Sequence, residues 1–410
     1  MTSKLRVLIL SQYYWPESFR ITEVVQALRA EGCEVLVLTG QPNYPKGFSF
    51  KGYSWWSINR EEHEGITILR VPLIPRGDGS AMLMVFNYLS FVISATVFGS
   101  WQLRGISIDL IMVFAPSPIL QAIPAIWLAK LKNASLVTWI QDLWPESLKD
   151  TGYVKNLRIL AIVSGVVRWI YQKNNLLLVP SHAFIDPVKD MSGTVPVVYH
   201  PNPGDFAFSE PLKKQDCPIK FEDKFNVVFT GNLGKVQSLK TILDSAEMLI
   251  ADPEITIYLV GSGSQSDWVR SEISRRHLAN VELPGRFDLI DMPLIMSQAS
   301  ALLVSLIRSQ IMSKTVPSKV QAYLAAGRPI IASLDGEGAR IVVEAGAGLI
   351  SGAEDAKGLA QAIMSLKNMS AMERKAMGDN GQAYYAANYE PRFLSQKLKD
   401  LLCSFHGDFQ

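Results

Sequence analysis

The sequence is poor in the residues that form disulfide frameworks and metal centres. It has only three cysteines, Cys33, Cys217 and Cys403, which lie far apart, and its five histidines show no metal-ligand spacing. No D-x-D motif occurs anywhere in the 410 residues. These absences argue against a disulfide-stapled or zinc-bound fold and are typical of a chain in a reducing cytoplasm.

Strong charge of one sign is also missing. The formal net charge is only +2, so the overall charge does not favour binding to nucleic acid. No RNA- or DNA-reading motif is present either. Hydrophobic residues make up 48% and charged residues 19%, which is typical of a folded globular protein. A chain of 410 residues is too long for one ordinary core, so we expect two domains.

Residues 79 to 103 contain no charged side chain at all. The stretch is long enough to cross a bilayer, but polar residues such as Asn87, Ser94 and Thr96 dilute it. We favour a buried helix here, with an interfacial segment and a membrane-inserted helix as the alternatives.

Tryptophan is concentrated in the first 170 residues, which hold eight of the nine. Aromatic and basic residues beside apolar stretches are typical of a protein docked on a membrane face, whereas clustering in one large core explains the tryptophans equally well. Trp101, Trp127 and Trp169 lie near basic residues in the sequence, namely Arg104, Lys130, Lys132, Arg168 and Lys173.

Short apolar runs alternate with helical stretches twice along the chain. The runs are almost continuously apolar, as expected of parallel strands covered on both faces. This pattern predicts an α/β protein with two Rossmann-like, doubly wound domains facing a cleft. The candidate strands are residues 6–10, 34–39, 66–71, 109–114, 135–140 and 176–180 in the first half, and 226–230, 255–261, 280–285, 301–306 and 328–333 in the second.

The change between domains is expected in the polar, proline-rich segment from 200 to 218. We predict an N-terminal acceptor-binding domain over 1–203 and a C-terminal donor-binding domain over 204–387. The amphipathic helix expected over 388–404 needs a surface to cover and would pack back on the first domain. Two such domains favour a two-substrate enzyme, with a two-lobed binding protein as the alternative.

One candidate phosphate site follows the second domain's first strand. Gly231, Asn232 and Gly234 lie in the turn, and Lys235 is placed to contact a diphosphate. Glycines at a strand-to-helix turn let backbone N–H groups approach a phosphate, and the helix start adds positive partial charge. A plain turn with a solvated lysine is the alternative.

A second candidate lies at the start of a short helix predicted over 318–326. Pro317 and Ser318 suit a helix start. Lys319 falls in the first turn, where a cation opposes the helix dipole, so an anionic ligand explains it better than stability does. A chance surface lysine remains the alternative. Gln321, on the same helix, joins the candidate donor-binding residues.

Further candidates follow strands of the first domain. Asp142 lies just past the fifth strand, where a carboxylate can act as a base or orient a hydroxyl, or can instead cap the turn that follows. Arg20 lies near a helix start and Glu17 in the loop before it. Glu146 and His182 are weaker candidates.

These motifs carry a resemblance over nearly the whole chain. YYWPES, QDLWPES, TGNLGK and VPSKVQAYLAAGRPIIA resemble the retaining glycosyltransferases of family 4, which have the GT-B fold. More closely, the chain is similar to a bacterial surface-polysaccharide branch that includes N-acetyl-L-fucosamine transferases and colanic-acid transferases.

The resemblance implies a hexosyltransferase that moves a sugar from a nucleotide-diphosphate donor, UDP-linked, to a polyprenyl-diphosphate-linked saccharide in O-antigen, lipopolysaccharide or capsule synthesis. It implies no metal or other cofactor and a peripheral place on the cytoplasmic membrane face. The implied roles are catalysis for Asp142, donor binding for Gly231, Asn232, Lys235, Ser318, Lys319 and Gln321, and acceptor binding for Arg20 and Glu17.

The chain departs from the family pattern at the donor site. Family 4 commonly carries an E-x7-E pair, and counting back from the glycine of AAGRP places those positions at Lys314 and Ala322. The usual arginine and lysine after the second domain's first strand are Asn232 and Gln237 here. The changes suit a 6-deoxy or N-acetylated sugar, or a donor held by backbone amides. Two rivals stay open, a nucleotide-sugar 2-epimerase and a catalytically silent scaffold of a polysaccharide assembly complex.

Overall fold

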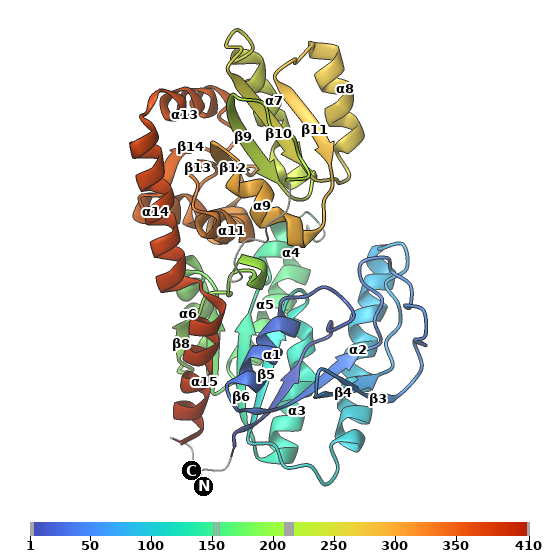
Figure 1. Ribbon diagram of the computed structural model, residues 1–410. Coiled ribbons are helices and arrows are strands. Elements are labelled where there is room, and N and C mark those ends of the chain that lie inside the picture. Colours follow the sequence, from blue (N-terminus) through green and yellow to red (C-terminus); the bar gives the residue numbers. More distant parts are fainter. Residues whose placement is uncertain (1–3, 151, 153, 155, 209–216, 408–410) are drawn as a thin grey trace. The chain divides into compact units, whose positions relative to one another are not determined.

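The computed structural model describes residues 4–407 except 151, 153, 155 and 209–216. It divides into two compact units, here called unit 1 (Met1–Pro201 with Arg392–Gln410) and unit 2 (Asn202–Pro391). The domain ends predicted at 203 and 387 lie close to these divisions. Each unit is a parallel sheet with helices on both faces, which confirms the prediction of two Rossmann-like α/β domains (Figure 1).

Unit 1 is built on an eight-stranded sheet in the order β3-β4-β2-β1-β5-β6-β7-β8. Neighbouring strands are parallel except β3 and β4. From β1 the chain first adds strands on the side of β2 and then on the side of β5, so the order of strand addition reverses at β1. Ligands of open α/β sheets bind at the carboxyl edge beside such a reversal. The strands are β1 (Arg6–Leu10), β2 (Glu34–Gly40), β3 (Asn59–His63), β4 (Ile66–Val71), β5 (Leu110–Ala115), β6 (Ser135–Ile140), β7 (Leu176–Val179) and β8 (Val197–Tyr199).

Two edge strands of unit 1 escaped sequence prediction for different reasons. Strand β3 reads NREEH and has no apolar face to signal it, because it lies at an exposed edge. Strand β8 has only three residues. The six predicted strands all form within one or two residues of their expected ends.

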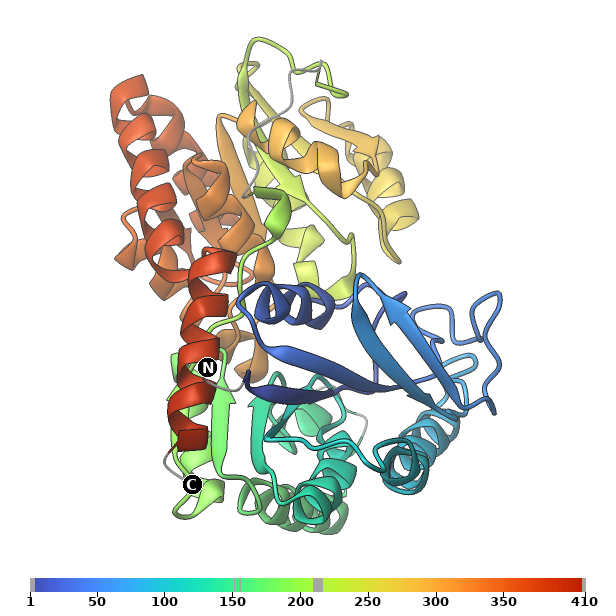
Figure 2. The same cartoon turned by 60° about the horizontal axis from the view of Figure 1, so that its bottom comes forward.

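Helices cover both faces of this sheet. Helix α1 (Ile21–Ala30) shares one core cluster with the C-terminal helix α15 (Pro391–Gly407), whose Leu398 and Leu402 are buried there. The last helix therefore packs on unit 1. On the other face α3 (Ala122–Lys132) lies between α2 (Ala81–Gln102) and α5 (Leu157–Tyr171), as Figure 2 shows. Short helices α4 (Glu146–Asp150) and α6 (Ile185–Ser192) complete the unit.

The uncharged stretch forms α2, which is long and apolar enough to cross a membrane by length and composition alone. Its inner face is tied to the sheet, since Asn87 Oδ1 accepts a 2.7 Å hydrogen bond from Gln12 and Ser94 Oγ donates to Pro72 O at 2.6 Å. Phe91 and Ala95 on that face are fully buried. The predicted buried helix is therefore only half right, because the outer face is exposed.

Unit 2 repeats the doubly wound plan with six parallel strands in the order β11-β10-β9-β12-β13-β14. The chain reverses direction about β9, between β10 and β12. The strands are β9 (Phe225–Thr230), β10 (Ile255–Val260), β11 (Val281–Gly285), β12 (Ala301–Ser305), β13 (Ile330–Ser333) and β14 (Gly348–Ser351). The helices are α7 (Leu239–Met248), α8 (Ser266–Arg276), α9 (Met292–Ser297), α10 (Gln310–Lys314), α11 (Ser318–Ala326), α12 (Glu337–Glu344), α13 (Ala356–Asn368) and α14 (Ala371–Asn388).

Candidate functional site

The glycine turn after β9 lies at the switch point of unit 2 and is packed against the turn after β10. Gly231 has φ +116°, and a Cβ on Gly261 would lie 1.8 Å from the Gly231 carbonyl oxygen. Leu233 N donates to Ser262 O at 3.0 Å. The glycines of VGSGS therefore serve the close packing of two strand ends.

Helix α11 is fixed over that turn by one buried tyrosine. The Tyr323 hydroxyl accepts a 3.0 Å hydrogen bond from Thr230 N and donates to Leu303 O at 3.1 Å. Val320 and Leu324 pack in the core beside it. Because Lys319 lies one turn before Tyr323, this anchor carries the lysine to the end of β9.

Lys319 is the residue that the fold brings to the glycine turn. Its Nζ donates a short hydrogen bond to Gln237 Oε1 and lies 4.1 Å from the centroid of the Phe229 ring. Its chain passes so close to the turn that a Cβ on Gly231 would lie 2.9 Å from Lys319 Cε. The helix start and the glycine turn that the sequence offered as two candidate sites therefore lie side by side.

Desolvation lowers the pKa of the Lys319 ammonium to about 7. In the part of the chain that the structure describes, no carboxylate forms an ion pair with it. A desolvated cation with a neutral amide and a ring as its neighbours is costly, and a bound anion would offset that cost. This environment makes Lys319 a candidate ligand of an anion.

Gln237 and Phe229 are residues of this site that the sequence analysis did not predict. Position 237 is the one where the family's usual lysine is replaced, and here the replacement binds the ammonium of Lys319. The positive charge beside the glycine turn therefore comes from a lysine of α11 rather than from a lysine of the turn. The partners are 82 residues apart, so only the fold reveals the exchange.

The other predicted donor residues differ in how exposed their side chains are. Asn232, Lys235 and Ser318 are exposed, and Lys235 opens the short 3-10 helix Lys235–Gln237. Gln321 is buried, and its Nε2 donates to Asn202 O at 2.8 Å. Its side chain is therefore bonded to the start of unit 2, and a donor contact by Gln321 stays a prediction.

Neither position at which the family commonly has a glutamate carries a carboxylate in this chain. Ala322 packs against the apolar core, and Lys314 ends α10. Glu337 and Glu344 of α12 both form ion pairs with Arg340, and Asp335 just before that helix pairs with Arg308. A donor at this site would thus meet a lysine and backbone amides rather than an acidic pair.

Asp142 lies in the turn between β6 and α4. Ser147 Oγ donates a short hydrogen bond to its Oδ1, and Trp144 Nε1 donates to its Oδ2 at 3.3 Å. Burial raises the pKa of this carboxyl above its ordinary value, although the hydrogen bonds from Ser147 and Trp144 oppose that shift. These side-chain bonds fix the carboxylate against the turn, and both the capping role through backbone amides and the catalytic role stay predictions.

Glu17 and Arg20 lie at the carboxyl edge of unit 1, in the loop between β1 and α1. Glu17 is only 4% exposed, and its Oε1 accepts from Asn43 N at 2.8 Å and from Tyr44 N at 2.7 Å. It thereby joins the loop after β1 to the loop after β2. Arg20 is half-buried and immediately precedes α1. Acceptor contacts by both residues stay predictions.

The outer face of α2 carries a continuous apolar stripe. Its side chains recur every three or four residues and are between 46% and 70% exposed, although a helix that is apolar all round is normally covered. Trp127 of α3 and Trp169 of α5 are exposed as well, at 54% and 43%. We call the exposed apolar residues of α2 the α2 stripe: Met82, Val85, Phe86, Leu89, Ile93, Val97 and Trp101.

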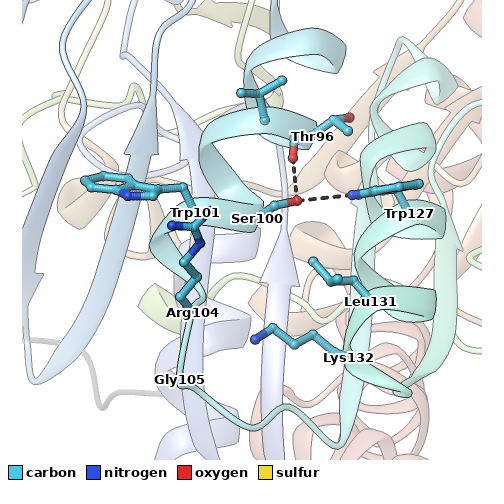
Figure 3. A pocket seen from close by; sticks show the side chains of 9 residues that line it. Thr96, Ser100, Trp101, Arg104, Gly105, Trp127, Leu131 and Lys132 are labelled. Carbon is cyan, nitrogen blue, oxygen red and sulfur yellow. Dashed lines mark hydrogen bonds between the residues drawn. The ribbon is translucent and has the colours of Figure 1, made fainter.

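An open pocket of about 570 Å³ lies where the stripe meets α3 (Figure 3). Trp127 Nε1 donates to Ser100 Oγ at 3.2 Å, which in turn donates to Thr96 O at 2.6 Å. Arg104 lines the pocket and is exposed. Apolar walls, indole rings and a cation thus meet in one pocket at the amino edge of the sheet.

Among residues 4–407 outside the gaps noted above, no group of three His, Cys, Asp or Glu side chains is placed to hold a metal ion.

Comparisons with known proteins cover both units. Residues 18–203 match the model of the glycosyl transferase 4-like domain, and residues 224–368 match that of glycosyl transferases group 1. The chain is 24% identical over 344 residues to WcaI of Escherichia coli (strain K12), a glycosyl transferase provisionally named for colanic acid biosynthesis, and the match covers 79% of this chain and 82% of that protein.

Solved structures resemble the whole chain. A sucrose-phosphate synthase from Thermosynechococcus elongatus gives a TM-score of 0.71 at 15% identity, covering 99% of this chain and 100% of that one. Anabaena HepE in complex with UDP gives 0.68 at 14% identity, covering 98% and 100%. At these identities the likeness shows the fold, and it agrees with the predicted GT-B class.

Proposed function

The chain belongs to the group 1 and family 4-like glycosyltransferases, and from this premise we propose that it transfers a sugar from a UDP-linked donor to a polyprenyl-diphosphate-linked saccharide. The sugar would be N-acetyl-L-fucosamine or another deoxy or N-acetylated hexose, moved with retention at the anomeric carbon. The name of the WcaI relative supports a place in the synthesis of a surface polysaccharide such as O-antigen or capsule.

The observation that carries the proposal is the desolvated Lys319 over the Gly231 turn. An incoming diphosphate would accept hydrogen bonds from the ammonium and from backbone amides at the turn, in the manner of other phosphate sites at strand-to-helix turns. The UDP held by a structural neighbour at 14% identity supports a nucleotide donor. Asn232, Ser318 and the exposed Lys235 would complete the donor site.

The chemistry of the leaving group follows from the same residues. As the bond from the anomeric carbon to the diphosphate breaks, negative charge grows on the diphosphate oxygens. Lys319, Lys235 and the amide end of α11 would stabilise that charge, so we propose a reaction without metal or other cofactor. Asp142, held by Ser147 and Trp144, would orient a sugar hydroxyl from unit 1.

We further propose that the enzyme is a peripheral protein on the cytoplasmic face of the membrane, where it would meet a polyprenyl-linked acceptor. The α2 stripe would dip into the interface, with the helix lying along the membrane, because its inner face is tied to the sheet and cannot leave it. Trp101 and Trp127 suit the headgroup level, and the exposed Arg104 suits anionic lipid.

A transfer assay tests the proposed activity. Purified protein is given a panel of nucleotide sugars with or without polyprenyl-diphosphate-GlcNAc, and UDP release and the glycosylated lipid are measured. We expect release that depends on the lipid acceptor, together with an elongated lipid product. Conversion of a nucleotide sugar without any acceptor would identify an epimerase instead, and no turnover with any donor would favour the silent scaffold.

Vesicle binding tests the membrane docking separately. Ile93→Gln should weaken binding to anionic vesicles about tenfold, because burying such a side chain contributes about 1.5–3 kcal/mol. Met372→Gln on α14 is the matched control, since Met372 is 80% exposed and lies in unit 2. Equal vesicle binding by Ile93→Gln and the wild type would disprove docking through the stripe.

A further inference from the structure

Three loops at the carboxyl edge of unit 1 are joined into one rim. They follow β1, β2 and β4 and cover residues 11–20, 41–58 and 72–80. Glu17 joins the first loop to the second through Asn43 N and Tyr44 N. The second loop is joined to the third, because Asn43 Oδ1 accepts from Arg76 N at 3.2 Å. Side chains on these loops are therefore held in fixed relation to one another.

The rim carries a cluster of aromatic rings. Tyr13 and Phe19 stack with centroids 5.0 Å apart, and Tyr44 lies 5.1 Å from Phe19 and 5.8 Å from Tyr13. Tyr13 is 2% exposed whereas Tyr44 is 37% exposed, so Tyr44 is the ring that faces outward. We call Tyr13, Phe19, Tyr44 and Arg76 the aromatic rim.

Arg76 is the only charged member of the aromatic rim. Its guanidinium carbon lies 5.3 Å from the Tyr44 centroid and 6.0 Å from that of Tyr13, and Nη2 contacts Met84 Sδ at 3.9 Å. Across the described residues no carboxylate pairs with it. An arginine held by rings and without an anion offers its planar set of donors to a ligand, and that geometry matches phosphate oxygens.

The beginning of α2 adds a second, independent feature beside Arg76. The helix has 22 residues, no acidic residue in its first turn and no side-chain hydrogen bond at its N-cap Ser80. Asp78 Oδ1 accepts from the N-cap amide of Ser80 at 2.9 Å, and the first-turn amides that follow, together with the helix dipole, favour an anion there. The same helix starts the α2 stripe at Met82, so positive charge and a lipid-facing surface adjoin.

We propose that Arg76 binds the diphosphate of the lipid-linked acceptor and that Tyr44 packs against the first sugar. This inference rests on the proposed function and names the part of unit 1 that recognises the acceptor. The polyprenyl chain would leave along the α2 stripe, the diphosphate would contact Arg76 and the amides that open α2, and the saccharide would lie over the rim. Aromatic rings supply flat apolar surface for a sugar and keep a polar hydroxyl available.

Steady-state kinetics with two acceptors tests this. One acceptor is a short-chain polyprenyl-diphosphate-GlcNAc, and the other carries the same sugar and chain through a neutral linker. Arg76→Gln should raise KM for the diphosphate acceptor about 10- to 100-fold, in line with the loss of a hydrogen bond to a charged group, and should leave KM for the neutral acceptor and the donor unchanged. Tyr44→Leu should raise KM for both acceptors, and Tyr44→Phe should rescue most of that loss.

Controls separate the possible failures. Arg60→Gln removes one exposed arginine of unit 1 outside the rim and should change neither acceptor constant. If Arg76→Gln unfolds, Arg76→Lys keeps the charge without the planar donor set and should still show a raised KM for the diphosphate acceptor alone. An unchanged acceptor KM, or a raised donor KM, would overturn the inference while transfer itself persists. Absence of lipid-dependent transfer in the wild type would instead overturn the proposed function.

Discussion

The carboxyl edges of the two sheets have the same topology but differ in the groups they present. In unit 2 the edge is a glycine turn crossed by one desolvated lysine, Lys319, with a ring and an amide as neighbours. In unit 1 the edge is a rim of aromatic side chains with the half-buried Arg76, and a buried glutamate ties its loops together.

This difference is what two kinds of ligand would require under the proposed function. A turn of backbone amides with a single lysine binds phosphate and reads little else. Aromatic rings with an arginine suit a larger ligand that has both flat apolar surface and charge. Two variants of the same Rossmann-like plan would thus divide donor from acceptor by the chemistry of their loops. Each prediction below perturbs one edge and measures whether the other responds.

The largest effect is expected from Lys319→Ala. Removing the ammonium should weaken UDP binding about 10- to 100-fold, the range for a hydrogen bond to a charged group, and should leave acceptor KM unchanged. Calorimetric titration with UDP measures it. Lys240→Ala is the control, because Lys240 is exposed in the same unit and pairs with Asp244. Unaltered UDP affinity would show that Lys319 is not the phosphate ligand.

Gly231→Ala should weaken UDP binding about tenfold. The new Cβ would lie 2.9 Å from Lys319 Cε and would push the ammonium out of place, in a turn whose φ of +116° already disfavours a side chain. Gly285→Ala isolates the backbone strain, since Gly285 has φ +93° with nothing within 4 Å of a new Cβ. If both variants lose the same UDP affinity, strain rather than the lysine contact is responsible.

Sequence alone predicted the plan of both sheets and the candidate residues Lys319, Gly231 and Glu17 at their carboxyl edges. Continuous apolar runs located the strands, and a cation in the first turn of α11 pointed to Lys319. The rest depends on contacts between distant residues. The Lys319–Gln237 bond spans 82 positions, and the rim of Arg76 combines three loops that show no periodicity. The burial of Glu17 and its bonds to the loop after β2 also cannot be read from a loop sequence.

The pH dependence of donor binding should be smaller but diagnostic. Without a ligand the pKa of Lys319 is about 7, so above that pH its amine is mostly neutral. Binding of a diphosphate then requires that the amine be protonated. Affinity for an intact nucleotide sugar should therefore fall roughly tenfold between about pH 6.5 and 8.5. Lys319→Arg stays charged throughout and should remove this dependence. A flat wild-type profile would contradict a lowered pKa of Lys319.

The smallest effect is expected at Glu17, and it separates structure from recognition in unit 1. Burial raises the pKa of Glu17 to about 7, against the opposing effect of its backbone hydrogen bonds. Because the folded state then holds the proton more tightly than the unfolded state, the contribution to stability is present at low pH and is lost as pH rises through about 7.

The variant Glu17→Gln cannot titrate, so its melting temperature should lack the fall, by roughly a few degrees, that the wild type shows between about pH 4.5 and 7. Gln also places an NH₂ group where Glu17 Oε2 accepts from Tyr14 N, which should loosen the rim. We expect a rise of a few-fold in acceptor KM, since Tyr44 loses part of its support, and no change in donor KM. If the melting temperature changes but acceptor KM does not, the aromatic rim does not need the hydrogen bonds of Glu17 to bind its ligand.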